Sequence, residues 1–138
     1  MPALPPPQNL TDCLRAAGVL CTNPRGWWGG VTTDGIPVVT TWLDAAVAPD
    51  QFWIWQPLNN RGRLLDEWIA GNIRVGTVVR LIILKQDGNE PLHEQRYMAR
   101  GQARLMPGYW RVRETRHCPK GKPAAIVEPL PQTSEAAA

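Results

Sequence analysis

Residues 75–84 read VGTVVRLIIL, a nearly continuous run of β-branched residues and leucines. A strand with one face in water alternates apolar and polar residues, whereas this run is apolar at almost every position. We therefore predict a central strand that is buried on both faces and ends at the turn-forming residues 86–89. The rest of the fold is expected to assemble around this strand.

Two further strand signals precede this run. The pair Asp34-Gly35 lies between β-branched segments within residues 31–42, which predicts a β-hairpin. Residues 51–56 alternate Phe52 and Ile54 with tryptophans, which predicts a strand with large side chains on both faces. Strands are therefore expected on both sides of the chain's midpoint.

Helical spacing marks two short segments. Apolar residues recur every three or four positions between residues 10 and 20, with Asn9 or Thr11 available as the N-cap. Residues 64–69 show the same spacing and are followed by Gly71-Asn72, a typical helix stop. We expect one short N-terminal helix and one helix inserted before the central strand.

Length and composition indicate one globular domain, since the chain has 138 residues, 43% hydrophobic and 20% charged. We predict a proline-rich arm over residues 1–8, a single domain over 9–128 and a disordered tail over 129–138. The order of elements predicts a mainly β (α+β) fold. The expected architecture is a small, partly closed antiparallel barrel of the OB-, SH3- or PUA-like kind, with a short edge strand at residues 124–127.

Positive charge is concentrated in residues 96–122, which hold eight of the fifteen Lys and Arg residues and one acid, Glu114. Pro107-Gly108 can form a two-residue turn, so we predict a hairpin in which Met106 lies opposite Tyr109. In that register Arg104 lies across from Arg111. One face of the hairpin would then carry Arg100, Gln102, Arg104, Met106, Tyr109, Arg111 and Arg113, and the other face the remaining apolar residues.

A strand pair lined with arginines favours an anionic partner. The leading interpretation is a non-enzymatic module that binds DNA or RNA, as a single strand or through a modified base. The same face would alternatively dock an acidic protein or close a homodimer, which makes the chain a protein-interaction or regulatory adaptor. The predicted nucleic-acid contacts are Arg100, Gln102, Arg104, Tyr109, Arg111, Arg113, Lys120 and Lys122, with Trp27 and Trp28 as stacking aromatics.

Catalysis receives little support, because the only serine is Ser134 and no nucleotide-hydrolysis or zinc-protease motif occurs. No catalytic residue and no cofactor is predicted. A metal-dependent nuclease that uses Asp34, Asp44 or Glu67 with Lys85 stays open, since such sites assemble from dispersed carboxylates.

Cysteine usage argues against a disulfide framework, because the chain has an odd number at low density. Cys13, Cys21, His117 and Cys118 are zinc-ligand types at spacings that fit no usual zinc motif, so no metal site is predicted. The first residues lack a basic segment followed by an apolar one, so no secretory signal is expected, and no apolar run reaches membrane-spanning length. We expect a cytoplasmic protein without a membrane partner.

Overall fold

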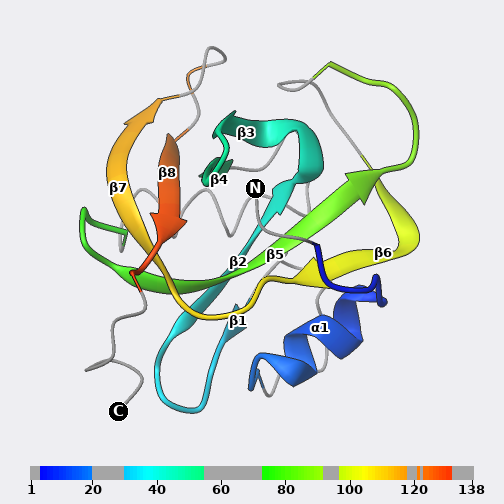
Figure 1. The fold of residues 1–138 in the computed structure, drawn as a ribbon, viewed down its shortest axis with the longest axis horizontal. Helices are drawn as coiled ribbons and strands as arrows, with labels where there is room; N and C mark the ends of the chain where they lie inside the picture. Colours follow the sequence, from blue (N-terminus) through cyan, green and yellow to red (C-terminus); the bar gives the residue numbers. More distant parts are fainter. Residues whose placement is uncertain are drawn as a thin grey trace.

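The computed structural model describes residues 4–19, 30–54, 73–91, 97–117, 121 and 123–131. The predicted inserted helix, Trp27, Trp28, Lys120, Lys122 and residues 132–138 lie outside these ranges. Figure 1 shows the arrangement of the elements. In chain order they are α1 (Leu10–Ala16), β1 (Gly30–Val31), β2 (Pro37–Trp42), the 3₁₀ helix η1 (Leu43–Ala45), β3 (Ala46–Ala48), β4 (Gln51–Ile54), β5 (Val78–Gln86), β6 (Met98–Leu105), β7 (Trp110–His117) and β8 (Pro123–Pro129).

The described strands form one mixed sheet in the order β1-β2-β5-β7-β8-β4-β3, with β6 also paired to β5. A mainly β fold is therefore confirmed. The predicted antiparallel barrel is wrong, because this sheet is not closed and because β2 and β5 pair in parallel. Residues 43–77 separate these two strands, which leaves ample length for the crossover that a parallel pair requires. The OB-, SH3- and PUA-like details are not confirmed.

The predicted central strand is confirmed as β5. Its residues 79 and 81–84 are at most 1% exposed, and it pairs with β2 on one edge and with β6 and β7 on the other. The strand begins later than predicted, because Val75 is 66% exposed in the turn before it. Pairing on both edges and packing on both faces explain why almost every position of this strand is apolar.

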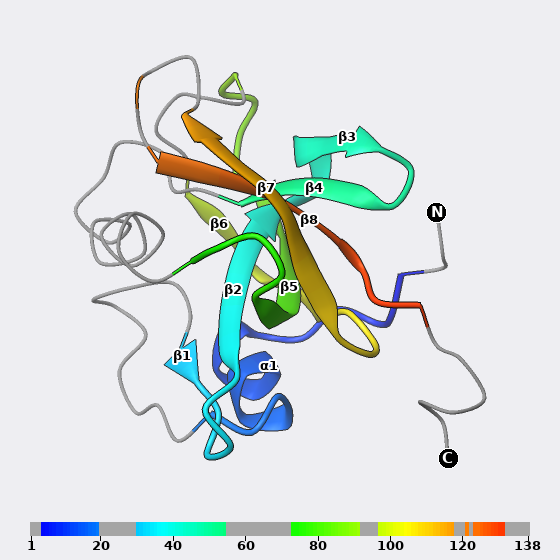
Figure 2. The same cartoon turned by 90° about the vertical axis from the view of Figure 1, so that its left-hand side faces the viewer.

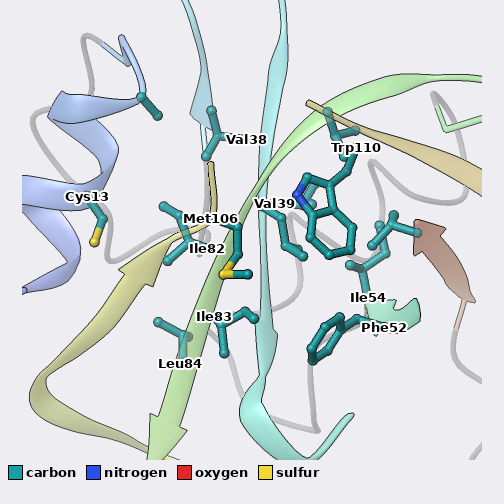
Figure 3. Close-up of a cluster of buried hydrophobic side chains, with 14 of the residues drawn as sticks. Cys13, Val38, Val39, Phe52, Ile54, Ile82, Ile83, Leu84, Met106 and Trp110 are labelled. Atoms are coloured by element: carbon teal, nitrogen blue, oxygen red, sulfur yellow. The ribbon is translucent and has the colours of Figure 1, made fainter. Parts of the chain in front are cut away.

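Figure 3 shows apolar side chains on both sides of β2 and β5. On one side Cys13 of α1 approaches the layer that contains Ile82 and Leu84. On the other side the rings of Phe52 and Trp110 meet edge to face, with centroids 5.9 Å apart. The two layers share β5, so this strand couples the helix side of the molecule to the side formed by β4, β7 and β8.

The predicted N-terminal helix is confirmed as α1. Asn9 is its N-cap, and the Asn9 side chain accepts a hydrogen bond of 2.8 Å from the backbone N–H of Asp12. The helix ends at Ala16 with Ala17 as its C-cap; Gly18 follows with φ +96°, and the Val19 N–H donates to the Leu14 carbonyl at 3.0 Å. No helix among the described residues has the length and apolar character needed to cross a membrane.

Three other predicted strand regions are also found, but one of them, predicted as an edge strand, lies inside the sheet. The hairpin around Asp34-Gly35 is β1–β2, with Val31 opposite Pro37. In β4, Phe52 and Ile54 are buried and Trp53 is partly exposed, as the alternation predicted. The predicted edge strand is β8, which lies between β7 and β4 and so is not an edge.

The predicted hairpin between residues 96 and 116 is wrong. β6 and β7 follow one another along the same edge of β5, with Leu105 opposite Ile82 and Trp110 opposite Val79. Between these positions the chain bulges at Pro107-Gly108, and Met106, predicted on the exposed face, is 1% exposed. Alternation of side chains is the same in a hairpin and in one bulged strand, because it specifies the face and not the partner strand.

Candidate nucleic-acid interface

Two of the predicted arginines lie together on the outer face of β7 and β8. Arg111 pairs with Glu128 across the strands, and its Nε donates to Glu128 Oε2 at 2.8 Å. A β-bulge between Val112 and Glu114 makes Arg113 the extra residue, and its Nη1 donates to Glu128 Oε1 at 3.3 Å. The hydrogen bond from Arg111 is the main cause that lowers the pKa of Glu128 below its ordinary value. One carboxylate therefore orders two half-exposed guanidiniums.

A second charged group continues along the same face. Glu114 and Trp53 both pair with Ile126 of β8, from opposite edges, so all three side chains point to one side of the sheet. Arg116 forms a 2.6 Å ion pair with Glu114, and its guanidinium carbon lies 4.9 Å from the centroid of the Trp53 ring. This side chain remains 45% exposed. We call the side chains of Trp53, Arg111, Arg113, Glu114, Arg116 and Glu128 the arginine face.

A cavity of about 440 Å³ opens where β7 ends and β8 begins. Figure 2 shows this end of the two strands on the far side of the molecule from α1. The cavity is bordered by charged and polar side chains on one part of its wall and by apolar side chains on the rest. Its lining residues are Ile73, Arg74, Thr115, Arg116, His117, Pro123 and Ala124.

A tight turn places Arg74 at this cavity. The segment before β5 runs beside β7, since the Gly76 N–H donates to the Val112 carbonyl at 2.8 Å. Within the turn, the Thr77 N–H donates to the Arg74 carbonyl, and the Arg74 N–H donates to Thr77 Oγ1, both at 3.0 Å. Gly76 has φ +91°, a conformation that favours glycine. The backbone of Arg74 is thus fixed next to β7.

The structure does not bring the four predicted arginines together. Arg104 lies opposite Ile83 and Arg111 opposite Val78, so they are five positions apart along β5, about 17 Å, and alternate to opposite faces. The Nε of Arg104 donates to the carbonyl of Pro5 at 3.1 Å, in the N-terminal arm. The predicted juxtaposition of Arg104 with Arg111 is therefore wrong, and Arg100 and Gln102 lie on β6 with Arg104.

Tyr109 lies at the bulge between β6 and β7. Its side chain is 49% exposed, and the guanidinium carbon of Arg80 lies 5.4 Å from its ring centroid. The Nε of Arg80 is buried and has no hydrogen-bond partner among the described residues. This ring already contacts a cation on the central strand.

Sequence reasoning missed Trp53, Arg74, Arg116 and His117 as site residues, together with the two glutamates, Glu114 and Glu128, that order the arginines. Arg116 and His117 do form an adjacent pair of cationic types at the end of the basic stretch, which is a usable signal. Trp53 and Arg74 carry no such signal, because they reach β7 through the pairing of β4 with β8 and through the turn before β5. These contacts depend on tertiary structure.

Of the residues considered for metal chemistry, Asp44 and Lys85 lie at the same cavity, and Cys21, Glu67 and Cys118 fall outside the described residues. This separate cavity has a volume of about 290 Å³, whereas Asp34 is exposed in the turn between β1 and β2. Cys13 is buried under α1, its Sγ donates to Gln8 Oε1 at 3.8 Å, and burial raises its pKa. No group of three His, Cys, Asp or Glu side chains that could hold a metal ion occurs in the described part of the chain.

Neither a protein-family model, nor a curated protein, nor a solved structure matches this chain. Its chemistry is therefore inferred from its own residues.

Proposed function

We propose that the chain is a non-enzymatic module that binds single-stranded nucleic acid through the arginine face. One observation carries the proposal: the guanidinium of Arg116 lies over the Trp53 ring, stays 45% exposed, and continues a row that includes Arg111 and Arg113. Nucleobases stack on aromatic rings and on arginine planes, and arginines in such a row reach backbone phosphates. The face combines both kinds of contact on three paired strands.

Charge on this face predicts modest affinity. Three guanidiniums stand against the two carboxylates of Glu114 and Glu128, so the net positive excess is small. For single strands the logarithm of the binding constant falls with the logarithm of salt concentration with a slope of about −0.7 per phosphate contact. Contacts from all three arginines would give a slope of about −2.

Anisotropy of a labelled single-stranded oligonucleotide, titrated at several salt concentrations, tests the proposal. Arg116→Ala should weaken binding, and Arg116→Lys should restore little of it, because lysine keeps the charge and lacks the planar group that supports stacking. Arg15→Ala is the matched control, because Arg15 is 76% exposed on α1, and α1 lies apart from β7 and β8 in Figure 1. Absence of binding to any DNA or RNA, or binding that salt does not weaken, would refute the proposal.

The two carboxylates also favour the alternative, a protein-interaction adaptor. A face that carries both signs of charge can be complementary to itself, as a two-fold homodimer interface requires. Glu128→Gln separates the two functions. It should strengthen nucleic-acid binding by freeing Arg111 and Arg113, and it should weaken a dimer, which the mass in solution reports. The cytoplasmic location belongs to the proposal as well.

A further inference from the structure

We infer that the cavity at the end of β7 and β8 binds a phosphate monoester, either the terminal phosphate of a nucleic-acid strand or that of a small phosphorylated molecule. The strand-end form of this inference rests on the proposed function, whereas the phosphate site itself does not. Donor groups, their ordering and the position of the cavity each support it.

The donor groups come from two separate segments. Arg74 lies in the turn before β5, and Thr115, Arg116 and His117 lie at the end of β7. Among the described lining residues there is no carboxylate, and the remaining wall is the apolar Ile73, Pro123 and Ala124. All four donor residues are exposed, so an anion from solution can reach them.

Both guanidiniums are ordered by hydrogen bonds within the chain. Arg74 Nη1 donates to the Ile73 carbonyl at 3.0 Å, and Arg116 uses Nε and Nη2 on Glu114. A guanidinium has five N–H donors in a fixed fork, so Arg116 retains its Nη1 donors for a second partner, and Arg74 brings a second guanidinium to the same cavity. The fork matches phosphate oxygens in a bidentate way.

A monoester fits the cavity better than an internal phosphodiester. It carries about −1.5 to −2 charges at pH 7 and three acceptor oxygens, enough to engage both guanidiniums and His117. The volume of about 440 Å³ is that of a small-molecule site, so the attached sugar has room. Arg116 belongs to both the cavity and the arginine face, so a strand lying on the face would end here.

The test compares one oligonucleotide sequence with a 5′-phosphate, with a 3′-phosphate and with hydroxyl ends, alongside titration of inorganic phosphate followed by the NMR signals of His117. We expect one phosphorylated end to bind about tenfold more tightly than the hydroxyl form. Arg74→Gln should abolish this preference and leave binding of the hydroxyl form unchanged. Arg111→Gln is the control, because it should weaken all three oligonucleotides by the same factor.

The possible results separate the two ideas. Equal affinity for all three ends, with no shift of the His117 signals by phosphate, overturns the phosphate site and leaves the proposed function standing. Phosphate binding that Arg74→Gln removes, without binding of any oligonucleotide, overturns the proposed function and supports a site for a small phosphorylated molecule. Circular dichroism of Arg74→Gln, with Arg74→Lys as a second variant that keeps the charge, shows whether a loss reflects unfolding.

Discussion

Strands β6 and β7 pair with the same edge of β5 and are both rich in arginine, yet their arginines have different surroundings. On β6, Arg104 donates to the carbonyl of Pro5. The edge of β6 that faces away from β5 forms one β-bridge among the described residues, between Ala103 and Gln8. On β7, three arginines are ordered by two glutamates and a tryptophan. Neighbouring strands, more than local charge density, therefore decide whether basic residues are ordered together on one face.

The largest effect should come from the core anchor of β7. Trp110→Ala should lower the free energy of unfolding by about 3–5 kcal/mol, since this side chain is 2% exposed and contacts Phe52. Met98→Ala on β6 should cost much less, because Met98 is only partly buried. Urea unfolding measures both.

Trp110→Phe is the control for this anchor. The indole N–H of Trp110 is buried without a hydrogen-bond partner among the described residues, so phenylalanine removes an unsatisfied donor as well as some apolar area. Its cost should be well below that of Trp110→Ala. If Trp110→Ala and Met98→Ala lowered the free energy of unfolding by similar amounts, β6 and β7 would contribute equally to the core, which would contradict this prediction.

The next largest effect should be on oligonucleotide binding. Two double variants, each of which removes two positive charges, compare β7 with β6. Arg111→Gln with Arg113→Gln should weaken oligonucleotide binding for all sequences and reduce the salt slope by about 0.7 per arginine. Arg100→Gln with Arg104→Gln on β6 should leave both quantities unchanged. Equal losses in the two double variants, measured by anisotropy, would show that the distinction between β6 and β7 has no functional meaning.

Much of the fold could be predicted because its signals are local. The uniform apolar run of β5, the Asn9 cap of α1 and the Asp34-Gly35 turn each occupy a short stretch of chain. The partners of the strands could not be predicted, because residues 100–113 alternate identically in a hairpin and in one bulged strand. The error in pairing alone placed Arg104 beside Arg111.

The candidate site was predictable only in part, for the same reason. Arg111 and Arg113 were found from the charge of the stretch that contains them. Glu128, which orders them, is 17 residues from Arg111 along the chain, and Trp53 reaches Arg116 only because β4 pairs with β8. Contacts between distant segments depend on the order of strands in the sheet, which no short pattern records.

A smaller effect concerns the arm held by β6. Arg104→Gln should weaken the attachment of residues 4–8 by about 1 kcal/mol, because the hydrogen bond from a charged donor to the Pro5 carbonyl is lost. Hydrogen exchange at the Gln8 amide, which donates to Ala103 at 2.8 Å, should become faster. Arg113→Gln should leave that amide unchanged, and faster exchange in both variants would contradict a local role for Arg104.

The smallest effect is the pH dependence that Glu128 gives to β7. In the folded state its arginine partners, Arg111 first, lower its pKa below the ordinary value of 4.5. The unfolded chain therefore binds the proton more readily, so the ion pair stabilises the fold above pH 4.5, and this contribution is lost as the pH falls through the folded-state pKa. Because the arginines are half-exposed, we expect a few tenths of a kcal/mol to about 1 kcal/mol.

Unfolding free energies of Glu128→Gln and the unchanged chain, measured from neutral pH down to about pH 3, check this prediction. The variant should be less stable at neutral pH, and the two curves should converge in acid, where Glu128 is protonated in both states of the unchanged chain. Arg104 on β6 has no carboxylate partner among the described residues, so the curve for Arg104→Gln should stay parallel to that of the unchanged chain. Parallel curves for Glu128→Gln would show that Glu128 does not order the arginines of β7, and the contrast between the two strands would then rest on Trp53 and Glu114 alone.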